Sequence, residues 1–517
     1  MEKLYSGEYS FAEYYPSNND GSVKKIAYYY KDKEDVVFDG NGDTLLFEKG
    51  VYPFIIDNCK NVTLKNFKID FTASFYLAAE ILSADESGFV LRGGEELSLK
   101  NGELVSLSGG EKNLGFFYGQ EYNSELKVPY KGSDFLAVTA LKPGESVPEK
   151  PSYGLYVRVS ETDDKNIRFR ILGKKGVNGV LHKGGKLVIF LTDRKNGAIY
   201  VKDSRNVKIE NVTVYSSPAM GVICQNCENV ALNRFVVKVK NDNALVSANA
   251  DATHFVNCRG KISITDCVFY NMMDDAVNIH GIYGKVLSVS GKTAVIGLMH
   301  YQQRGVNFIS AGDEISFLSS EDFSKKADYR AEKSVLSENK EYLTVTFEKE
   351  LKGVSAGDVA DNVTAMPEAE ILRCKTGVNR PRGFLLTSGK PMRVENCLFE
   401  NPYMAIHITS DARRWYESGK VNSLTIKNNV FRGCNYSGGH AAIEIDPECG
   451  AERAYVHSNI VIENNVAEGC YGGFIKAKKV RGLKIINNAI KNKRCDETVA
   501  QISLSDCDTV TESGNNV

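Results

Sequence analysis

The sequence predicts an all-β protein, a right-handed parallel β-helix with two inserted small antiparallel β-barrel or sandwich domains. Three observations lead to this prediction. Short segments of alternating apolar and polar residues recur along the chain, an asparagine often follows at the same offset, and two regions interrupt the recurrence with longer alternating strands. We expect the β-helix to comprise residues 1–75, 198–281 and 371–517, with insertions at 76–197 and 282–370.

The recurring segments have the length and pattern of short strands. A representative one is "NVKIENVTVY" (206–215), in which apolar residues alternate with polar ones and an Asn lies at the corner. Alternation with a period of two indicates strands, and Asn tolerates the left-handed backbone of a turn. Val207 and Val230 are 23 residues apart, as are Ile460 and Leu483. Such a period is typical of coils that stack about 4.8 Å apart, since one repeat cannot bury its apolar face alone.

The two interrupting regions contain longer alternating strands. Examples are "YGLYVRVSETDDKNIRFRIL" (153–172) and "EYLTVTFEKEL" (341–351), which favour antiparallel barrels or sandwiches. Long insertions on one side of a repeat usually wall a binding site. The second insertion begins directly after "NIHG" (278–281), so we expect it to leave the helix beside the preceding pair of acids, Asp274 and Asp275.

Composition excludes several classes of partner. The chain has 64 basic and 65 acidic residues, which argues against a nucleic acid or an anionic membrane as partner. It contains no apolar run of about 18 residues, so no membrane span is expected. The first residues, "MEKLYSGEYSFAEYY" (1–15), lack the apolar core of a signal peptide. The 12 cysteines are widely spread with a single CxxC, Cys224 and Cys227, so we interpret them as small buried residues. We expect no cofactor and no metal.

Three acids are predicted to converge on one face of the coil. Asp251 precedes Asp274 by 23 residues and Asp275 by 24, which is one coil of the repeat. Residues one coil apart lie above one another in a solenoid. Three further polar residues close to the acids in the sequence are candidates for substrate binding: His254, Asn278 and His280.

Clustered acids of this kind suit glycoside hydrolysis. One acid must stay protonated to donate to the leaving oxygen, and nearby like charges raise its pKa. The other carboxylates hold and deprotonate a water; a separation of about 6.5–9.5 Å implies inversion and one of about 5–5.5 Å retention. Three alternatives remain open from the residues alone. The Asp274–Asp275 pair would then cap a solvent-facing turn, the stacked acids would bind calcium, or His280 would be a structural histidine.

Two blocks of the sequence resemble glycoside hydrolase family 110, the exo-acting α-1,3-galactosidases. They are "ADATHFVNCRGKISITDCVFYNMMDDAVNIHGIY" (250–283) and "RGFLLTSGKPMRVENCLFENPYMAIHITSDARRWYESG" (382–419), and the resemblance extends over most of the chain. It implies an inverting, metal-independent enzyme that removes terminal α-1,3-linked galactose from blood-group B and related linear glycans. It also implies that Asp251 is the general acid and that Asp274 and Asp275 position and deprotonate the water.

The second block and the segments on either side of it, "NRPRG" (379–383) and "HAAIEIDPE" (440–448), add candidates for sugar binding. Trp415 is the only Trp in the chain and suits stacking on a sugar face, the alternative being a buried core Trp. Five polar residues are further candidates: Arg380, Arg382, Asp411, Glu417 and Glu444. The arginines among them are equally interpreted as solvated charges. Arg413 and Arg414 depart from the family pattern, in which small amides precede the "WYESG" segment, and this puts glycan specificity in doubt.

Two other functions compete with this interpretation. A polygalacturonase-like inverting hydrolase also uses clustered aspartates on a β-helix, but it typically shows a Gly-His-Gly that is absent here. A non-catalytic glycan-binding β-helix module is the alternative from another class. An enzyme acting on host or dietary glycans is expected to be secreted or periplasmic, although this chain shows no signal peptide. A homo-oligomer is possible, because a partner chain can cap the ends of the coil.

Overall fold

The computed structural model describes residues 1–19, 21–94, 96–107, 111–133, 135–177, 181–192, 194–450 and 454–516. The chain divides into two compact units, one formed by Met1–Asp70 with Arg194–Val517 and the other by Phe71–Asp193. Strands dominate both units, and within the described ranges the one helical element is a 3₁₀ turn at Tyr301–Gln303. The predicted all-β fold, a parallel β-helix with small barrels, is therefore confirmed. No helix in the described part of the chain has the length and apolar character needed to cross a membrane.

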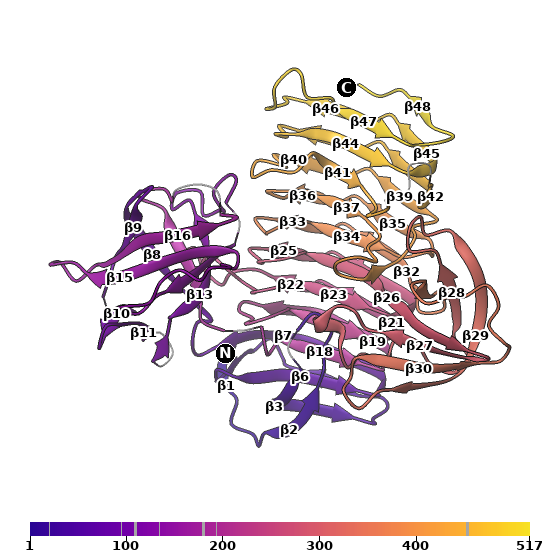
Figure 1. The fold of residues 1–517 in the computed structure, drawn as a ribbon, viewed down its shortest axis with the longest axis horizontal. Coiled ribbons are helices and arrows are strands. Elements are labelled where there is room, and N and C mark those ends of the chain that lie inside the picture. The colour runs from indigo at the N-terminus through magenta and orange to yellow at the C-terminus, as the bar shows by residue number, and fades with distance from the viewer. Residues whose placement is uncertain are drawn as a thin grey trace. The chain divides into compact units, whose positions relative to one another are not determined.

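The first unit is a coil of parallel strands that stack in chain order (Figure 1). In one of its sheets β19 (Arg205–Val214) pairs in parallel with β21 (Glu228–Asn233), so that Val207 lies opposite Val230. Ile460 and Leu483 form the same kind of pair further along. The 23-residue spacing seen in the sequence is therefore one coil, as predicted.

Asparagines hold the corners of this coil. Asn206 and Asn229 have positive φ angles of 55° and 56°, a conformation that Asn tolerates better than most residues. Deeper in the coil, Asn429 donates from its backbone and side-chain nitrogens to Asn465 Oδ1, at 2.9 and 3.0 Å. Asn465 donates in the same way to Asn488 Oδ1, at 3.0 Å from both nitrogens. Such a ladder satisfies buried polar groups that would otherwise destabilise the turn.

The second sheet of the coil carries the face on which the site lies. Its strands around the site are, in coil order, β6 (Val51–Asp57), β18 (Ile199–Lys202), β20 (Val222–Gln225), β23 (Thr253–Val256), β26 (Val277–Ser290), β34 (Phe384–Thr387), β37 (Ile406–Ile408) and β41 (Ala441–Ile445). Register pairs place one residue of each strand from β20 to β41 in a row that we call the site stripe: Ile223, His254, Asn278, Leu385, His407 and Glu444. Alternate residues on these strands, such as Phe255 and Ile279, are apolar and fully buried. The stripe is therefore the opposite face of the sheet.

The insertion that follows residue 281 forms a barrel, which we call the second barrel, and it shares strand β26 with this sheet. Strand β26 runs without interruption from the coil, where it pairs with β23, into antiparallel pairing with β27 (Thr293–Gly297) and β31 (Val359–Asn362). It also pairs with the short strand β38 (Glu417–Ser418), which places Glu417 opposite Ile282. The extended strand thus brings a distant carboxylate next to the residues that follow the acidic pair.

The other compact unit is a closed barrel with its own apolar core. Its strands follow the order β13, β14, β15, β16, β9, β8 and β17, and span the chain from β8 (Tyr76–Asp85) to β17 (Lys186–Phe190). Phe89 and Phe169 stack inside it with ring centroids 4.5 Å apart.

Candidate active site

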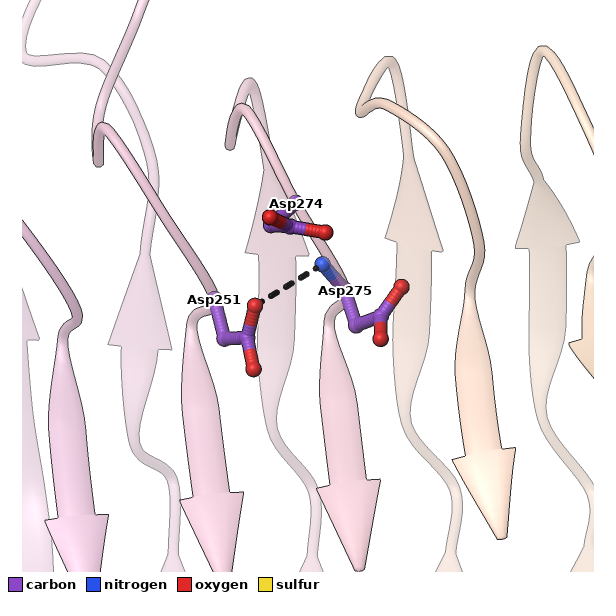
Figure 2. A group of neighbouring side chains, drawn as sticks. All are labelled: Asp251, Asp274 and Asp275. Carbon is purple, nitrogen blue, oxygen red and sulfur yellow. Dashed lines mark hydrogen bonds between the residues drawn. The ribbon is translucent and has the colours of Figure 1, made fainter. Parts of the chain in front are cut away.

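The three acids meet at the ends of two neighbouring coils, as Figure 2 shows. Asp251 lies just before β23, and Asp274 and Asp275 lie just before β26. One carboxylate oxygen from each residue lies within 4.8 Å of the others. The backbone N–H of Asp275 donates to Asp251 Oδ1 at 3.3 Å. The structure therefore brings together the acids that the one-coil spacing placed on one face.

Asp251, Asp275 and Arg382 occupy the same position in three successive coils. Each lies two residues before the first paired residue of its strand, because Thr253 pairs with Val277 and Val277 with Phe384. Arg382 donates to both oxygens of Asp275, from Nε to Oδ1 and from Nη2 to Oδ2, each at 2.8 Å. This bidentate geometry is among the stronger ion pairs in proteins.

The three carboxyl groups have different surroundings. Asp251 and Asp275 are 3% and 0% exposed, whereas the side chain of Asp274 is 21% exposed. Burial, together with the nearby charge of Asp274, raises the pKa of Asp251 well above its usual value. Burial also raises the pKa of Asp275, and the Arg382 guanidinium opposes that rise. Asp274 accepts a hydrogen bond from Arg194 Nη1 at 3.2 Å.

Carboxylate clusters also bind cations, and the charges around this one bear on that alternative. Calcium sites offer oxygen ligands to the ion from several sides. Here Arg382 already engages both oxygens of Asp275, and Arg194 contacts Asp274. A cation would therefore meet two guanidinium groups, and the residues fit a hydrolytic cluster better than a calcium site.

Two histidines lie behind Asp251 and contact each other. His254 Nδ1 lies 2.7 Å from Asp251 Oδ2, and His254 Nε2 lies 3.0 Å from His280 Nε2. His280 Nδ1 lies 2.6 Å from the carbonyl oxygen of Gly281. Both rings are 0–1% exposed, and burial lowers the pKa of each to about 4. All four ring nitrogens have partners within the protein, which leaves none of them open to the sugar contact expected from the sequence.

Glu417 joins the site from strand β38. Its Oε1 lies 4.0 Å from His280 Nε2 and accepts a hydrogen bond from Asn18 Nδ2 at 3.1 Å. Burial opposes ionisation, but the neighbouring His280 and Arg382 keep the pKa of Glu417 below its usual value. The structure thus places this sequence candidate beside the acids.

Three residues on the site stripe each hold a buried polar atom that lacks a hydrogen-bond partner in the described part of the protein. These atoms are Asn278 Oδ1, His407 Nδ1 and Glu444 Oε2. The other oxygen of Glu444 lies 2.9 Å from Lys476 Nζ and 3.1 Å from His440 Nδ1. Unpaired buried polar atoms are costly and mark positions where a ligand can complete the hydrogen bonds. His407 was not identified from the sequence, although it has the same register in "AIHIT" as Asn278 has two coils earlier.

Trp415 lies on the surface, not in the core. Its side chain is 40% exposed and packs against His300 of the second barrel, with ring centroids 4.6 Å apart. Asp411 accepts the backbone N–H groups of Arg413 and Arg414 at 2.7 and 2.9 Å, and also that of Trp415. Both oxygens of Asp411 are thus engaged in shaping the loop that presents Trp415.

Three arginines lie near the acids, and the sequence identifies two of them, Arg380 and Arg382, as candidates for the rim of the site. The structure instead pairs Arg382 with Asp275. Arg380, the other rim candidate, donates its backbone N–H to the carbonyl of Met272 at 3.2 Å, in the turn that leads to Arg382. Arg194 was not identified, because it lies 80 residues before Asp274 and belongs to no repeat segment.

Comparison with known proteins gives consistent relatives. Residues 293–360 match the GLAA-B beta-barrel domain II, and residues 182–297 match glycosyl hydrolases family 28. A protein of Shewanella woodyi named α-1,3-galactosidase A is 30% identical over 489 residues, which cover 92% of this chain and 77% of that protein. One of Bacteroides thetaiotaomicron, named α-1,3-galactosidase B, is 28% identical with the same coverage of both chains. A family 28 exopolygalacturonase of Yersinia enterocolitica is similar in structure, with a TM-score of 0.37, 12% identity, and coverage of 95% of this chain and 80% of that one.

Proposed function

Because the chain belongs to the α-1,3-galactosidase family of glycoside hydrolases, we propose that it removes terminal α-1,3-linked galactose from glycans by an inverting, exo-acting mechanism. The observation that carries the proposal is the convergence of three acids with unequal surroundings on adjacent coils. The inverting outcome is proposed from the family resemblance and not from the separation of the acids, because their nearest oxygens lie within 4.8 Å of one another, less than the separation of about 6.5–9.5 Å that implies inversion. The proposed substrates are blood-group B-type and linear α-1,3-galactosyl glycans. Such glycans lie outside the cell, so the proposal includes export to the periplasm or the medium.

In this proposal Asp251 is the general acid. It transfers its proton to the glycosidic oxygen while the bond from that oxygen to C1 of galactose breaks. A water attacks C1 from the opposite face and gives a proton to the carboxylate of Asp274 or Asp275, so the products are galactose of inverted configuration and the shortened glycan. The raised pKa of Asp251 and the ion pair that favours the ionised form of Asp275 support this division of roles.

Exo action is supported by an apolar block at one end of the site stripe. Toward the N-terminus the same row of the sheet continues as Tyr29, Ile55, Tyr200 and Ile223. These residues pack with Tyr14 in one hydrophobic cluster that also contains Ala250, the neighbour of Asp251. The polar part of the stripe therefore begins at His254, as expected for a pocket that is closed behind a terminal sugar.

Sugar binding is assigned to the other end of the stripe and to the exposed loop. Asn278, His407 and Glu444 each have an unpaired atom suited to a hydroxyl group. Trp415 offers an exposed ring for stacking on a sugar face. Arg413 and Arg414 are exposed in the same loop and are assigned to contacts with the branch sugar.

The test is proton NMR of the protein with a Galα1-3Gal disaccharide and, separately, with the fucosylated B trisaccharide. Release of galactose that first forms as the β-anomer, unchanged by EDTA, is the expected result, and the relative rates report the tolerance for branching. First-formed α-galactose would contradict inversion. No galactose from either substrate would overturn the proposal in favour of a glycan-binding module.

A further inference from the structure

We propose that His254 and His280 are positioning residues, which hold one proton in the contact between His254 and Asp251 and so keep Asp251 ready as a proton donor. The inference rests on the proposed function, in which Asp251 is the general acid. It concerns two buried rings that do not contact solvent, and it follows from counting donors and acceptors along three short contacts.

The count starts at the carbonyl oxygen of Gly281, which can only accept. His280 Nδ1 lies 2.6 Å from it and must therefore carry a hydrogen. A neutral imidazole carries one hydrogen, so His280 Nε2 is an acceptor. His254 Nε2 lies 3.0 Å from that acceptor and must in turn carry a hydrogen.

The same logic reaches the carboxyl group. With its hydrogen on Nε2, a neutral His254 can only accept at Nδ1, so Asp251 Oδ2 donates across the 2.7 Å contact. Two other arrangements have the same number of protons. One is a His254 imidazolium beside an Asp251 carboxylate, and the other is a His280 imidazolium that donates to His254 Nε2, with the hydrogen of His254 on Nδ1 toward the Asp251 carboxylate. In all three arrangements one proton lies in the contact between His254 and Asp251. Its removal would leave two acceptors facing each other in one of the three contacts, which buried groups avoid.

The charged surroundings agree with this count. Asp274 and Glu417 favour the neutral form of Asp251, and Arg194 and Arg382 favour its ionised form. The carboxyl groups of Asp251 and Asp275 also repel each other when both are ionised. Burial of Asp251 also favours its neutral form, as Asp274 and Glu417 do. The carboxyl group therefore keeps its proton above the pH at which an exposed Asp loses it. Burial also lowers the pKa of both histidines to about 4, so the rings are neutral near pH 7 and the proton belongs to Asp251.

The activity test uses two substitutions of His280 and the pH dependence of kcat/KM. A general acid must be protonated, so activity falls as pH rises through the pKa of Asp251. His280→Phe removes the acceptor for His254, whose hydrogen can then move to Nδ1 and stabilise the Asp251 carboxylate. We expect the basic limb to shift to lower pH by about one unit or more. His280→Gln offers an amide NH2 group as donor and a carbonyl oxygen as acceptor, and we expect it to keep the limb near the wild-type pH.

An unchanged basic limb in His280→Phe would overturn the proposal. An equal shift in both variants would also overturn it, because packing and not the order of donor and acceptor would then be responsible. KM is expected to change less than kcat, since neither ring has a nitrogen free for the sugar.

A second measurement uses the wild-type protein, so it depends neither on activity nor on whether a variant folds. ¹⁵N NMR of the histidine-labelled wild-type protein reports which ring nitrogens carry hydrogen. We expect a His280 with hydrogen on Nδ1 only and a His254 with hydrogen on Nε2, and a bare Nε2 on His254 would overturn the proposal. If these tautomers are found but no galactose is released from any substrate, the proposed function fails while the proton count stands.

Discussion

Asp251 and Asp275 occupy the same position in adjacent coils and are almost equally buried, yet their partners differ in kind. Asp251 faces a chain of two imidazoles, whereas Asp275 receives the two N–H groups of Arg382. A neutral imidazole chain retains a proton, while a guanidinium stabilises a negative charge. Burial alone therefore does not decide the protonation state of a carboxyl group. The partner of each carboxyl group decides it. His254 lies in the same coil as Asp251, whereas Arg382 lies one coil beyond Asp275, so equivalent positions of the repeat take opposite roles.

The largest effect on catalysis is expected when Asp251 is replaced by a residue that cannot donate the proton. Asp251→Asn should lower kcat for galactose release by about 10³-fold or more, since general acid catalysis contributes about 10²–10⁴-fold, while sugar binding by calorimetry is retained. The exposed Asp242→Asn is the matched control and should leave the rate unchanged. A variant of Asp251 with wild-type turnover would remove this residue from the mechanism.

Loss of the partner of Asp275 should lower the free energy of unfolding of the protein. Arg382→Met leaves Asp275 buried without its guanidinium, and breaking such a pair costs about 3–5 kcal/mol. Urea unfolding at about pH 7 measures the loss. The loss should shrink toward about pH 5, because an unpaired Asp275 whose pKa is raised by burial can take up a proton instead. An equal loss at both values would show that Arg382 acts by packing alone.

His457 is a buried histidine that, unlike His254, has no carboxyl partner among the described residues, and it therefore shows how burial acts on a ring without one. Burial and the charge of Lys420 lower the pKa of His457 to about 3, so the folded protein keeps this ring neutral. The unfolded chain takes up the proton below about pH 6.5, and stability is therefore lost as pH falls from about 6.5. His457→Gln should reduce the slope of the unfolding free energy against pH by about 1.4 kcal/mol per unit between about pH 6 and 4. An unchanged slope would show that His457 is already protonated in the folded state.

The stripe beyond the acids should affect binding more than chemistry. His407→Phe removes a ring nitrogen proposed to meet a sugar hydroxyl, and the loss of one such hydrogen bond is worth about 1–2 kcal/mol. We expect KM to rise by about tenfold, with a smaller change in kcat. Lys208→Ala, at an exposed position of β19, serves as the control. A change in kcat without a change in KM would place His407 in the chemical step.

The smallest effect on sugar binding is expected at the exposed ring of Trp415. Trp415→Ala should raise KM several-fold, because stacking contributes about 0.5–1.5 kcal/mol beyond area burial. Trp415→Phe should recover part of that loss. Identical KM values for all three proteins would show that the sugar does not reach this ring.

The sequence was sufficient to predict the coil and the convergence of the acids, because both depend on one number, the spacing of about 23 residues. The partners that distinguish the acids depend on other contacts. Arg382 follows Asp275 by 107 residues because the second barrel separates their coils. The spacing therefore gives no sign that the two residues are adjacent.

Local geometry explains the remaining differences. Asp411 was expected to bind a sugar, but its oxygens accept the N–H groups of its own loop. His254 and His280 were expected to bind sugar, yet their ring nitrogens contact Asp251, Gly281 and each other. Hydrogen-bond direction depends on side-chain orientation, which residue spacing does not determine.

The most direct test of the contrast between the two carboxyls is infrared difference spectroscopy at about pH 7. The spectrum of the wild-type protein minus that of Asp251→Asn should contain a band of a protonated carboxyl group. The corresponding difference for Asp275→Asn should contain only carboxylate bands. A carboxylate signal lost in both variants would contradict the account, because Asp251 would then hold no proton to donate.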